Sequence, residues 1–478
     1  MSRRSPRMPA ISICIMAVLF LVNPWVSTAL AKAPATQDAV FKVGEYGVAE
    51  SKYRPLKRQD MVLAGATILD GSGKKITGDI LVREGKIIAV GSFDIPEGLL
   101  IVDAKGKWIT PGLIDVHTHY GTYLLPQTPA DWEVSDVLEN SSPNVADTWI
   151  EHAVRPSDPA FRYALAGGVT ALQILPGSGA LFGGRTVVVK PVPAVTLAEM
   201  RFPGAPQGLK MACGSNPSNS FGGKGQYPNS RQGQIAGVRK AFLQAQAYSK
   251  KRLKVDGNNT ALADAPGDWD LISETLAATM NGELPVHLHC YRAEDIATWI
   301  EVLAEFNVKI AAVHHASEAY KISALLAEKR VCAAVWPDWW GFKREAEDAI
   351  PENAAFIDAA GGCAIMHSDI PLLGGLLNLE AAKAAAAGRR AGLPIPPEQA
   401  IRWITSNAAK ALGLEDQIGT IASNMNADIV IWSGDPFSVY SKAETVYIDG
   451  AAIFDSSHSE EKRLSDFELG RPAKEPVP

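Results

Sequence analysis

The chain has 478 residues, of which 47% are hydrophobic and 21% are charged, so it is long and apolar enough to bury one large core or two. Its formal net charge of −6 excludes the strongly basic surface that is typical of nucleic-acid-binding proteins. We therefore expect no nucleic-acid partner.

The first 31 residues have the order of a cleavable secretory signal. Arg3, Arg4 and Arg7 precede an apolar run at 11–22, and small residues follow up to Ala31, where we predict cleavage. The apolar run is shorter than the ~20 residues of a membrane span, which favours a signal over the alternative of an uncleaved anchor. No second long apolar run follows. The sequence thus predicts a secreted or periplasmic protein with no membrane partner.

Five cysteines are present, one of them in the predicted signal. The other four have no CxxC or zinc-ribbon spacing, and each lies in or just after an apolar run. Buried free thiols are the default prediction for such positions, although an exported protein can also oxidise a pair. These four are Cys213, Cys290, Cys332 and Cys363.

Both ends of the chain have the texture of β-strands. Residues 32–60 form a polar arm, and 61–107 then contain strand-like runs with a hairpin turn at Glu84-Gly85. Residues 414–455 return to the same texture, before a polar tail at 456–478. We predict a small β-sandwich assembled from both ends of the chain.

The middle of the chain, 108–413, alternates strand-like and helix-like runs. This alternation predicts parallel strands with helical crossovers, and eight strands over about 300 residues fit a (β/α)8 barrel. A doubly wound open sheet is the second choice, but no Gly-rich dinucleotide fingerprint follows any strand. The predicted strands are Leu113–His117, Val169–Leu175, Thr186–Val189, Leu209–Cys213, Pro285–His289, Ile310–His314, Val331–Trp336 and Cys363–His367.

Polar side chains gather at the ends of these strands, where a barrel places its active site. His117 and His119 close the first strand and lie on one face of it, so both imidazoles can reach the same cation. Neutral imidazoles suit zinc, iron, cobalt or nickel, and a carboxylate completes such a site. The later strands supply Lys210, His289, His314, His315 and Asp369.

Three segments in chain order resemble the amidohydrolase superfamily, in particular its imidazolonepropionase-like and prolidase-like members. They are Thr110–His119 (TPGLIDVHTH), Thr405–Gly413 (TSNAAKALG) and Ala427–Trp432 (ADIVIW). The resemblance covers about Met61 to Gly450. It implies a (β/α)8 barrel with a small β-sandwich, and a divalent metal site at the strand ends.

The resemblance also implies the ligands of that site. They are His117 and His119 from the first strand, a carboxylated Lys210, His289, His315 and Asp369. Lys190 is a weaker competitor of Lys210, and His314 stays an alternative to His315. His287 is expected to lie deeper, with a supporting or packing role. We expect zinc, as one or two ions per chain.

Charge suggests the mechanism that such a site performs. Two divalent ions lower the pKa of the water that bridges them, which gives a hydroxide nucleophile near neutral pH, and one ion polarises a substrate carbonyl. Asp369 is the predicted catalytic residue, because it accepts the proton of the water and delivers it to the leaving nitrogen. The predicted reaction is hydrolysis of a C–N bond in an amide, a cyclic amide or a dipeptide-like substrate.

Clues to the substrate lie in three loops. Residues 176–185 are Gly-rich and are expected to be flexible, 214–234 are long enough to form a lid, and 336–344 offer aromatic walls and two cations. The predicted substrate contacts, to a small molecule or a dipeptide, are Arg185, Tyr291, Arg292 and Arg344.

Two other functions stay open. A mononuclear deaminase or imidazolonepropionase-type ring hydrolase lacks the bridging lysine, so the state of Lys210 separates it from the favoured function. A non-catalytic barrel that serves as a binding protein is a different class, which the five strand-end ligands oppose. Assembly into a homo-oligomer is compatible with either.

Overall fold

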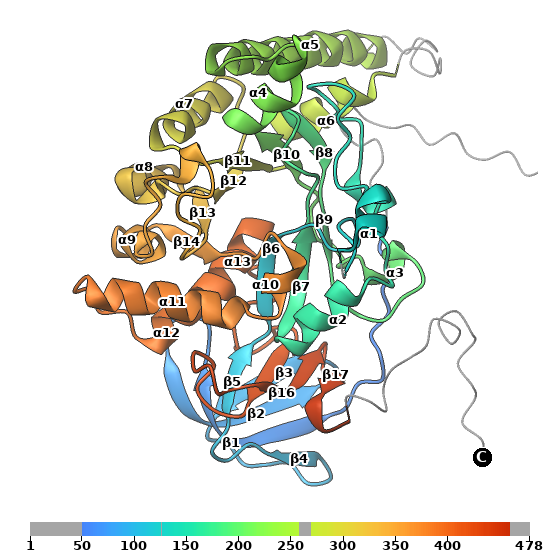
Figure 1. Cartoon of the computed structure of the whole chain (residues 1–478). Coiled ribbons are helices and arrows are strands. Elements are labelled where there is room, and N and C mark those ends of the chain that lie inside the picture. Colours follow the sequence, from blue (N-terminus) through green and yellow to red (C-terminus); the bar gives the residue numbers. More distant parts are fainter. Residues whose placement is uncertain (1–49, 126, 258–268, 459–478) are drawn as a thin grey trace, which may run out of the picture. The chain divides into compact units, whose positions relative to one another are not determined.

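The computed structural model describes residues 50–125, 127–257 and 269–458 (Figure 1). The predicted signal, most of the arm and most of the tail lie outside these residues. Among the described residues, no helix is long and apolar enough to cross a membrane.

Strands from both ends of the chain pair in one eight-stranded sheet. Its order is β17-β16-β15-β5-β1-β2-β3, with β4 also paired to β1. The predicted hairpin is confirmed, since Arg83 pairs with Lys86 across a turn in which Glu84 and Gly85 both have positive φ. The strands are β1 Met61–Leu69, β2 Lys75–Arg83, β3 Lys86–Gly91, β4 Leu100–Asp103, β5 Trp108–Pro111, β15 Ile429–Trp432, β16 Ala443–Ile448 and β17 Ala451–Asp455.

The middle of the chain forms two further sheets. One has the order β14-β13-β12-β11-β10-β8 and the other β6-β7-β9. The five neighbours from β10 to β14 are parallel, as the sequence predicts. The strands are β6 Leu113–Thr118, β7 Val169–Ile174, β8 Phe182–Arg185, β9 Val187–Val189, β10 Leu209–Ala212, β11 Val286–Cys290, β12 Ile310–His315, β13 Cys332–Val335 and β14 Cys363–Met366.

The fold is therefore mixed α/β, but strand pairing closes no eight-stranded barrel within the described ranges. One reason is β8, which pairs antiparallel to β10 and which the sequence assigned to a flexible loop. Its residues Phe182–Arg185 are all buried. The glycines that suggested flexibility allow close approach instead, since a Cβ on Gly184 would lie 2.4 Å from the carbonyl oxygen of Thr148.

Helices follow the parallel strands and lie outside the six-stranded sheet (Figure 1). The predicted helical runs are found as α7 Ala293–Ala304, α8 Ser323–Lys329 and α11 Leu377–Arg390. The predicted lid at 214–234 contains α4 Ser215–Phe221 and the start of α5 Arg231–Gly257. The other helices are α1 Pro129–Glu133, α2 Pro159–Ala166, α3 Leu197–Met200, α6 Leu271–Met280, α9 Asn353–Ala359, α10 Pro371–Gly374, α12 Pro397–Ala400 and α13 Ser406–Leu412.

The default prediction of four free thiols is wrong, because the cysteines form two disulfides. Cys213 is bonded to Cys290 and Cys332 to Cys363. Each bond joins two neighbouring parallel strands, β10 to β11 and β13 to β14. The spacing along the chain gave no sign of this, since the partners are 77 and 31 residues apart and meet only through strand register.

Candidate metal centre

Seven histidines, one lysine and one aspartate meet where the strands of the two middle sheets end. Strand register aligns them, since Lys210 lies opposite His287, and His289 opposite His314. All of the histidines and the lysine are buried, whereas the side chain of Asp369 is 22% exposed. The cluster consists of His117, His119, Lys210, His287, His289, His314, His315, His367 and Asp369.

Asp369 faces two imidazoles from β6 and the residues after it. Its Oδ1 lies 3.2 Å from Nε2 of His119 and 3.3 Å from Nε2 of His117. Nδ1 of His119 lies 2.7 Å from the carbonyl oxygen of Leu175, which can only accept, so this nitrogen carries the proton. In the neutral form of His119, the lone pair of Nε2 then points at a carboxylate. A cation between the two groups removes this repulsion, so the geometry fits a metal ion.

A second group of nitrogens lies beside the first. The ligand atoms of His117, His315 and His367 are all within 4.8 Å of one another, as are those of His117, His119 and Asp369. Among the described residues, both ring nitrogens of His289 and His367 and Nδ1 of His315 are buried without a hydrogen-bond partner. Buried polar atoms are rarely left unpaired, so these nitrogens also fit metal ligands.

The protonation states suit metal binding. Burial lowers the pKa of six of these histidines, to about 3 for His287 and His367, and the nearby Lys210 lowers the pKa of His117 further; the other three are His289, His314 and His315. These six histidines are therefore neutral at pH 7, which is the form that binds metals. Burial also lowers the pKa of Lys210 to about 7, although Asp369 opposes this shift. The amine of Lys210 donates to the carbonyl oxygen of Pro176 at 3.1 Å.

The backbone is strained at two residues of the cluster. His315 has φ 71° and Asp369 has φ 63°, a region that residues other than glycine rarely adopt. Asp369 is held there because its backbone N–H donates to the carbonyl oxygen of His117 at 2.9 Å. The buried Asp115 accepts from the backbone N–H groups of both His117 and Ser368. Strained backbone of this kind is common at functional sites, where surrounding interactions hold the residue in an unfavourable conformation.

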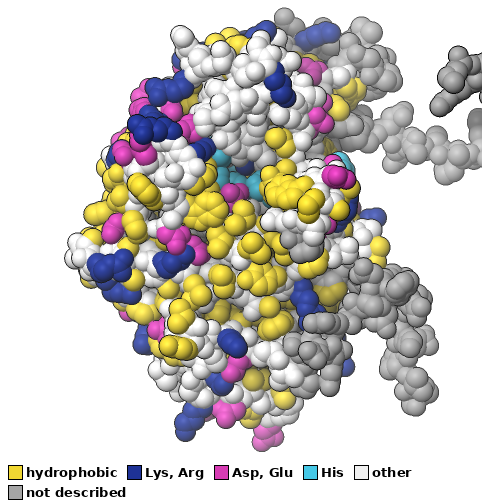
Figure 2. Space-filling model, in the orientation of Figure 1, with side chains coloured by type: hydrophobic (Ala, Val, Ile, Leu, Met, Phe, Trp, Pro, Cys, Tyr) yellow, Lys and Arg dark blue, Asp and Glu magenta, His cyan; other side chains and the backbone are white. Residues whose placement is uncertain are grey.

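Aromatic side chains line the way from the cluster to the surface. Tyr291 and Trp336 both stack on His315, with ring centroids 5.2 and 4.3 Å away. Tyr123 contacts His119 edge-on at 5.6 Å and also contacts Trp132, which is 54% exposed. In Figure 2, histidine and acidic side chains lie in a hollow with hydrophobic side chains around it.

The structure brings only one of the four predicted substrate contacts, Tyr291, to the cluster. Arg185 is buried elsewhere, bonded to Thr275 and Gln207 and stacked over Trp149. Arg344 is 85% exposed and pairs with Glu347.

The side chain of Arg292 is 32% exposed. It forms long ion pairs of 3.6 Å with Glu294 and 4.0 Å with Glu347. The structure therefore gives neither Arg292 nor Arg344 a contact with the histidines.

Two residues of the site were missed from the sequence. His367 lies two positions before Asp369. It ends an apolar run, so nothing in the sequence separates it from the core residues of that strand. Lys343 precedes Arg344 and lies 3.7 Å from the centre of the Tyr291 ring, bonded to Asn216 and Glu345. Its charge contributes to the lowered pKa of His289, after the effect of burial. The conformation of the loop decides whether Lys343 or Arg344 points towards the cluster, and the sequence alone does not reveal that conformation.

A mixed α/β fold with this cluster at its strand ends defines a hydrolase that acts on carbon–nitrogen bonds. The chain belongs to the Amidohydrolase family, which matches residues 108–461. It is 33% identical to the crystal structure of an amidohydrolase from Thermotoga maritima, with a TM-score of 0.75 over 83% of this chain and 100% of that one.

Two curated relatives are also similar. The chain is 30% identical to the amidohydrolase tasK of Hapsidospora irregularis over 408 residues, which are 79% of this chain but only 40% of that relative. It is 26% identical to the imidazolonepropionase of Shewanella halifaxensis over 78% of this chain and 89% of that one.

Proposed function

We propose that this chain hydrolyses an amide, cyclic amide or dipeptide-like bond at a divalent metal site, with Asp369 as the group that moves the proton. The observation that carries this proposal is the convergence of Nε2 of His117 and Nε2 of His119 on one oxygen of Asp369, at 3.3 and 3.2 Å. A neutral His119 with its proton on Nδ1 cannot donate to Asp369, whereas a shared cation accounts for the arrangement.

The ion would be held by His117, His119 and Asp369, with His289, His315 and His367 beside them. When bound, a divalent ion such as zinc polarises a carbonyl and lowers the pKa of water. Asp369 accepts a proton from the attacking water and returns it to the leaving nitrogen. The overall reaction adds one water across the C–N bond and gives a carboxylic acid and an amine.

We further propose that Lys210 carries a carbamate that links two ions. The neutral amine adds to the carbon of carbon dioxide and releases one proton, which gives an anionic carbamate. Burial supports this modification because it makes the amine neutral near pH 7. The alternative is a single-ion ring hydrolase, which the similarity to imidazolonepropionase favours.

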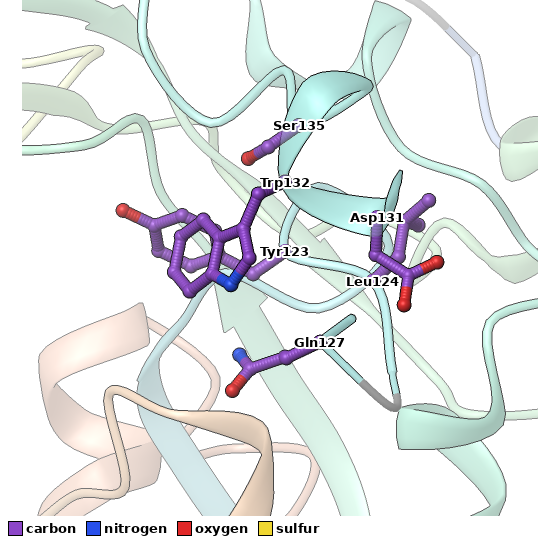
Figure 3. Close-up of a pocket in the computed structure, with 6 residues that line it drawn as sticks. All are labelled: Tyr123, Leu124, Gln127, Asp131, Trp132 and Ser135. Atoms are coloured by element: carbon purple, nitrogen blue, oxygen red, sulfur yellow. The ribbon is translucent and has the colours of Figure 1, made fainter. Parts of the chain in front are cut away.

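The aromatic residues beside the cluster indicate which chemical group of the substrate lies next to the scissile bond. Tyr123 and Trp132 line a shallow depression, together with Leu124 and Gln127 (Figure 3). This aromatic surface lies beside the cluster, because the Tyr123 ring contacts the His119 ring edge-on. We propose that the substrate carries an aromatic or large aliphatic group next to the scissile bond.

We also propose the fold and the export that were predicted from the sequence. The first is a barrel made by the two middle sheets. The backbone N–H of Asp369, just after β14, donates to the carbonyl oxygen of His117 in β6 and so links the two sheets. The strands from both chain ends would then form the accompanying sandwich. Export with cleavage after Ala31 is supported by the two disulfides, which persist in oxidising compartments.

One experiment tests the function. Protein loaded with zinc, with and without bicarbonate, is assayed against dipeptides, N-acyl amino acids and cyclic imides, and its metal content is measured. We expect turnover that a chelator abolishes, with apolar-flanked amides preferred. Two ions in bicarbonate support the carbamate, and one ion with ring opening supports the alternative. Less than one tightly bound ion per chain, with no turnover, contradicts the proposal.

A further inference from the structure

Three buried histidine rings form a hydrogen-bonded chain that leads away from the metal centre. Nδ1 of His117 lies 3.0 Å from Nδ1 of His314, and Nε2 of His314 lies 3.0 Å from Nδ1 of His287. Their exposed fractions are 0%, 0% and 1%. Both ring nitrogens of His314 are therefore bonded to other histidines, so this ring is not free to bind the metal.

Such a chain can be ordered in only two ways. A neutral imidazole has one N–H and one lone pair, so each bond needs an N–H on one side and a lone pair on the other. The tautomer of one ring therefore determines the tautomers of the other two. In one order the proton of His117 is on Nδ1, and in the other it is on Nε2.

Only the first order leaves His117 able to bind an ion through Nε2. Nδ1–H of His117 then donates to Nδ1 of His314, and Nε2–H of His314 donates to Nδ1 of His287. In the opposite order a proton occupies Nε2 of His117, which is the atom 3.3 Å from Asp369. The two orders contain the same number of protons, so they differ in arrangement and not in charge.

We propose that His314 and His287 are positioning residues that select the metal-binding tautomer of His117. This rests on the proposed function, since it assumes that His117 is a ligand. The partner of a metal-binding histidine is usually a carboxylate or a backbone carbonyl, which can only accept. Here it is a histidine, which accepts from His117 only when its own proton faces His287.

Close packing holds the far end of the chain. A Cβ at Gly208 would lie 2.6 Å from Cδ2 and 3.1 Å from Nε2 of His287. The imidazole thus occupies the space that a side chain at position 208 would need. This contact keeps the His287 ring against His314, because it has no room to swing towards β10.

The test compares two substitutions of His314. His314→Leu removes the acceptor for Nδ1–H of His117, whereas His314→Asn restores an amide oxygen at that side and breaks only the link to His287. Affinity for Zn²⁺ is measured by competition with a chromophoric chelator. We expect a loss of roughly 10–100-fold for His314→Leu, and a much smaller loss for His314→Asn.

Two controls separate positioning from folding. His152→Leu changes a histidine that stacks on Trp149 outside the cluster and should leave the affinity unchanged. Thermal unfolding of the metal-free variants should show that His314→Leu and His314→Asn fold equally well. Equal zinc affinities of these two variants, whether both normal or both weakened, overturn the proposal.

A spectroscopic readout reports the tautomers directly. In zinc-loaded protein labelled with ¹⁵N-histidine, we expect the proton of His117 on Nδ1 and the protons of His314 and His287 on Nε2. A proton on Nε2 of His117 in the loaded protein overturns the ordering. If the wild type binds no zinc, the proposed function fails and this proposal fails with it. Normal binding by the wild type without the predicted order overturns this proposal alone.

Discussion

His119 and Asp369 face each other at 3.2 Å, from Nε2 to Oδ1, at the centre of the cluster. The proton of His119 is held on the opposite side of the ring by the carbonyl oxygen of Leu175. Burial raises the pKa of Asp369, but the interactions with His119, His367 and Lys210 outweigh it and hold that pKa below its usual range. Asp369 is thus a carboxylate at neutral pH, ready to bind a cation or to accept a proton.

The first prediction concerns this carboxylate. Asp369→Asn keeps the size of the side chain but removes its charge and its ability to accept a proton. We expect kcat to fall roughly 10²–10⁴-fold on the best substrate, the range of general-base effects. Asp338→Asn is the matched control, because Asp338 is exposed and pairs with Lys383 at the surface. Steady-state kinetics and metal content are measured for both, and an Asp369→Asn enzyme with more than a tenth of the activity refutes the role.

The second prediction concerns the pH dependence of stability. The pKa of Lys210 falls from 10.5 to about 7 on folding because the amine is buried. Between these values the unfolded chain binds more protons than the folded protein, so this side chain makes stability rise with pH. We expect metal-free wild type to gain more free energy of unfolding between about pH 7 and about pH 9 than Lys210→Met. Urea unfolding at both pH values measures the difference, and equal gains speak against a buried neutral amine.

The third prediction concerns the disulfides. Closing loops of 77 and 31 residues stabilises the folded protein by roughly 3–5 kcal/mol for each bond, according to chain-entropy estimates. Replacing Cys332 and Cys363 together by alanine should lower the free energy of unfolding by about that amount. Thiol titration of denatured, unreduced protein should find none of the four cysteines free. Four reactive thiols in that assay would disprove the pairing.

The fourth prediction concerns the glycine of the TPGLIDVHTH segment. A Cβ at Gly112 would lie 1.9 Å from Oγ1 of Thr170, on the neighbouring strand β7. Gly112→Ala should therefore destabilise the protein by about 1–3 kcal/mol or more, as overpacking does. Gly223→Ala serves as control, since a Cβ there meets nothing within 4 Å.

A second substitution checks the cause of that effect. Thr170→Ala removes the clashing hydroxyl, so it should recover much of the loss in a double variant with Gly112→Ala. Denaturant unfolding measures all four proteins. Additive effects of the two substitutions would show that the contact is not the cause.

Much of the site was predicted from local pattern. An apolar strand that ends in His-x-His places two imidazoles on one face, and the later strands each end in a polar residue of a ligand type. Parallel strands carry such ends to one edge, so proximity of His117, His119, His289, His315 and Asp369 follows from the order of elements. The substrate contacts were predicted less well, because the direction of Arg185, Arg292 and Arg344 depends on packing partners that are distant in the chain.

The sequence by itself determined the alternation of strands and helices, the hairpin at Glu84-Gly85 and the ligand types at the strand ends, because each depends on neighbours within a few residues. Only the tertiary structure decided the pairing of the cysteines, the antiparallel strand β8, the inward position of His367 and the bonds of His314 to His117 and His287. These depend on the register between strands that lie tens to hundreds of residues apart, and register is set by packing of the whole core.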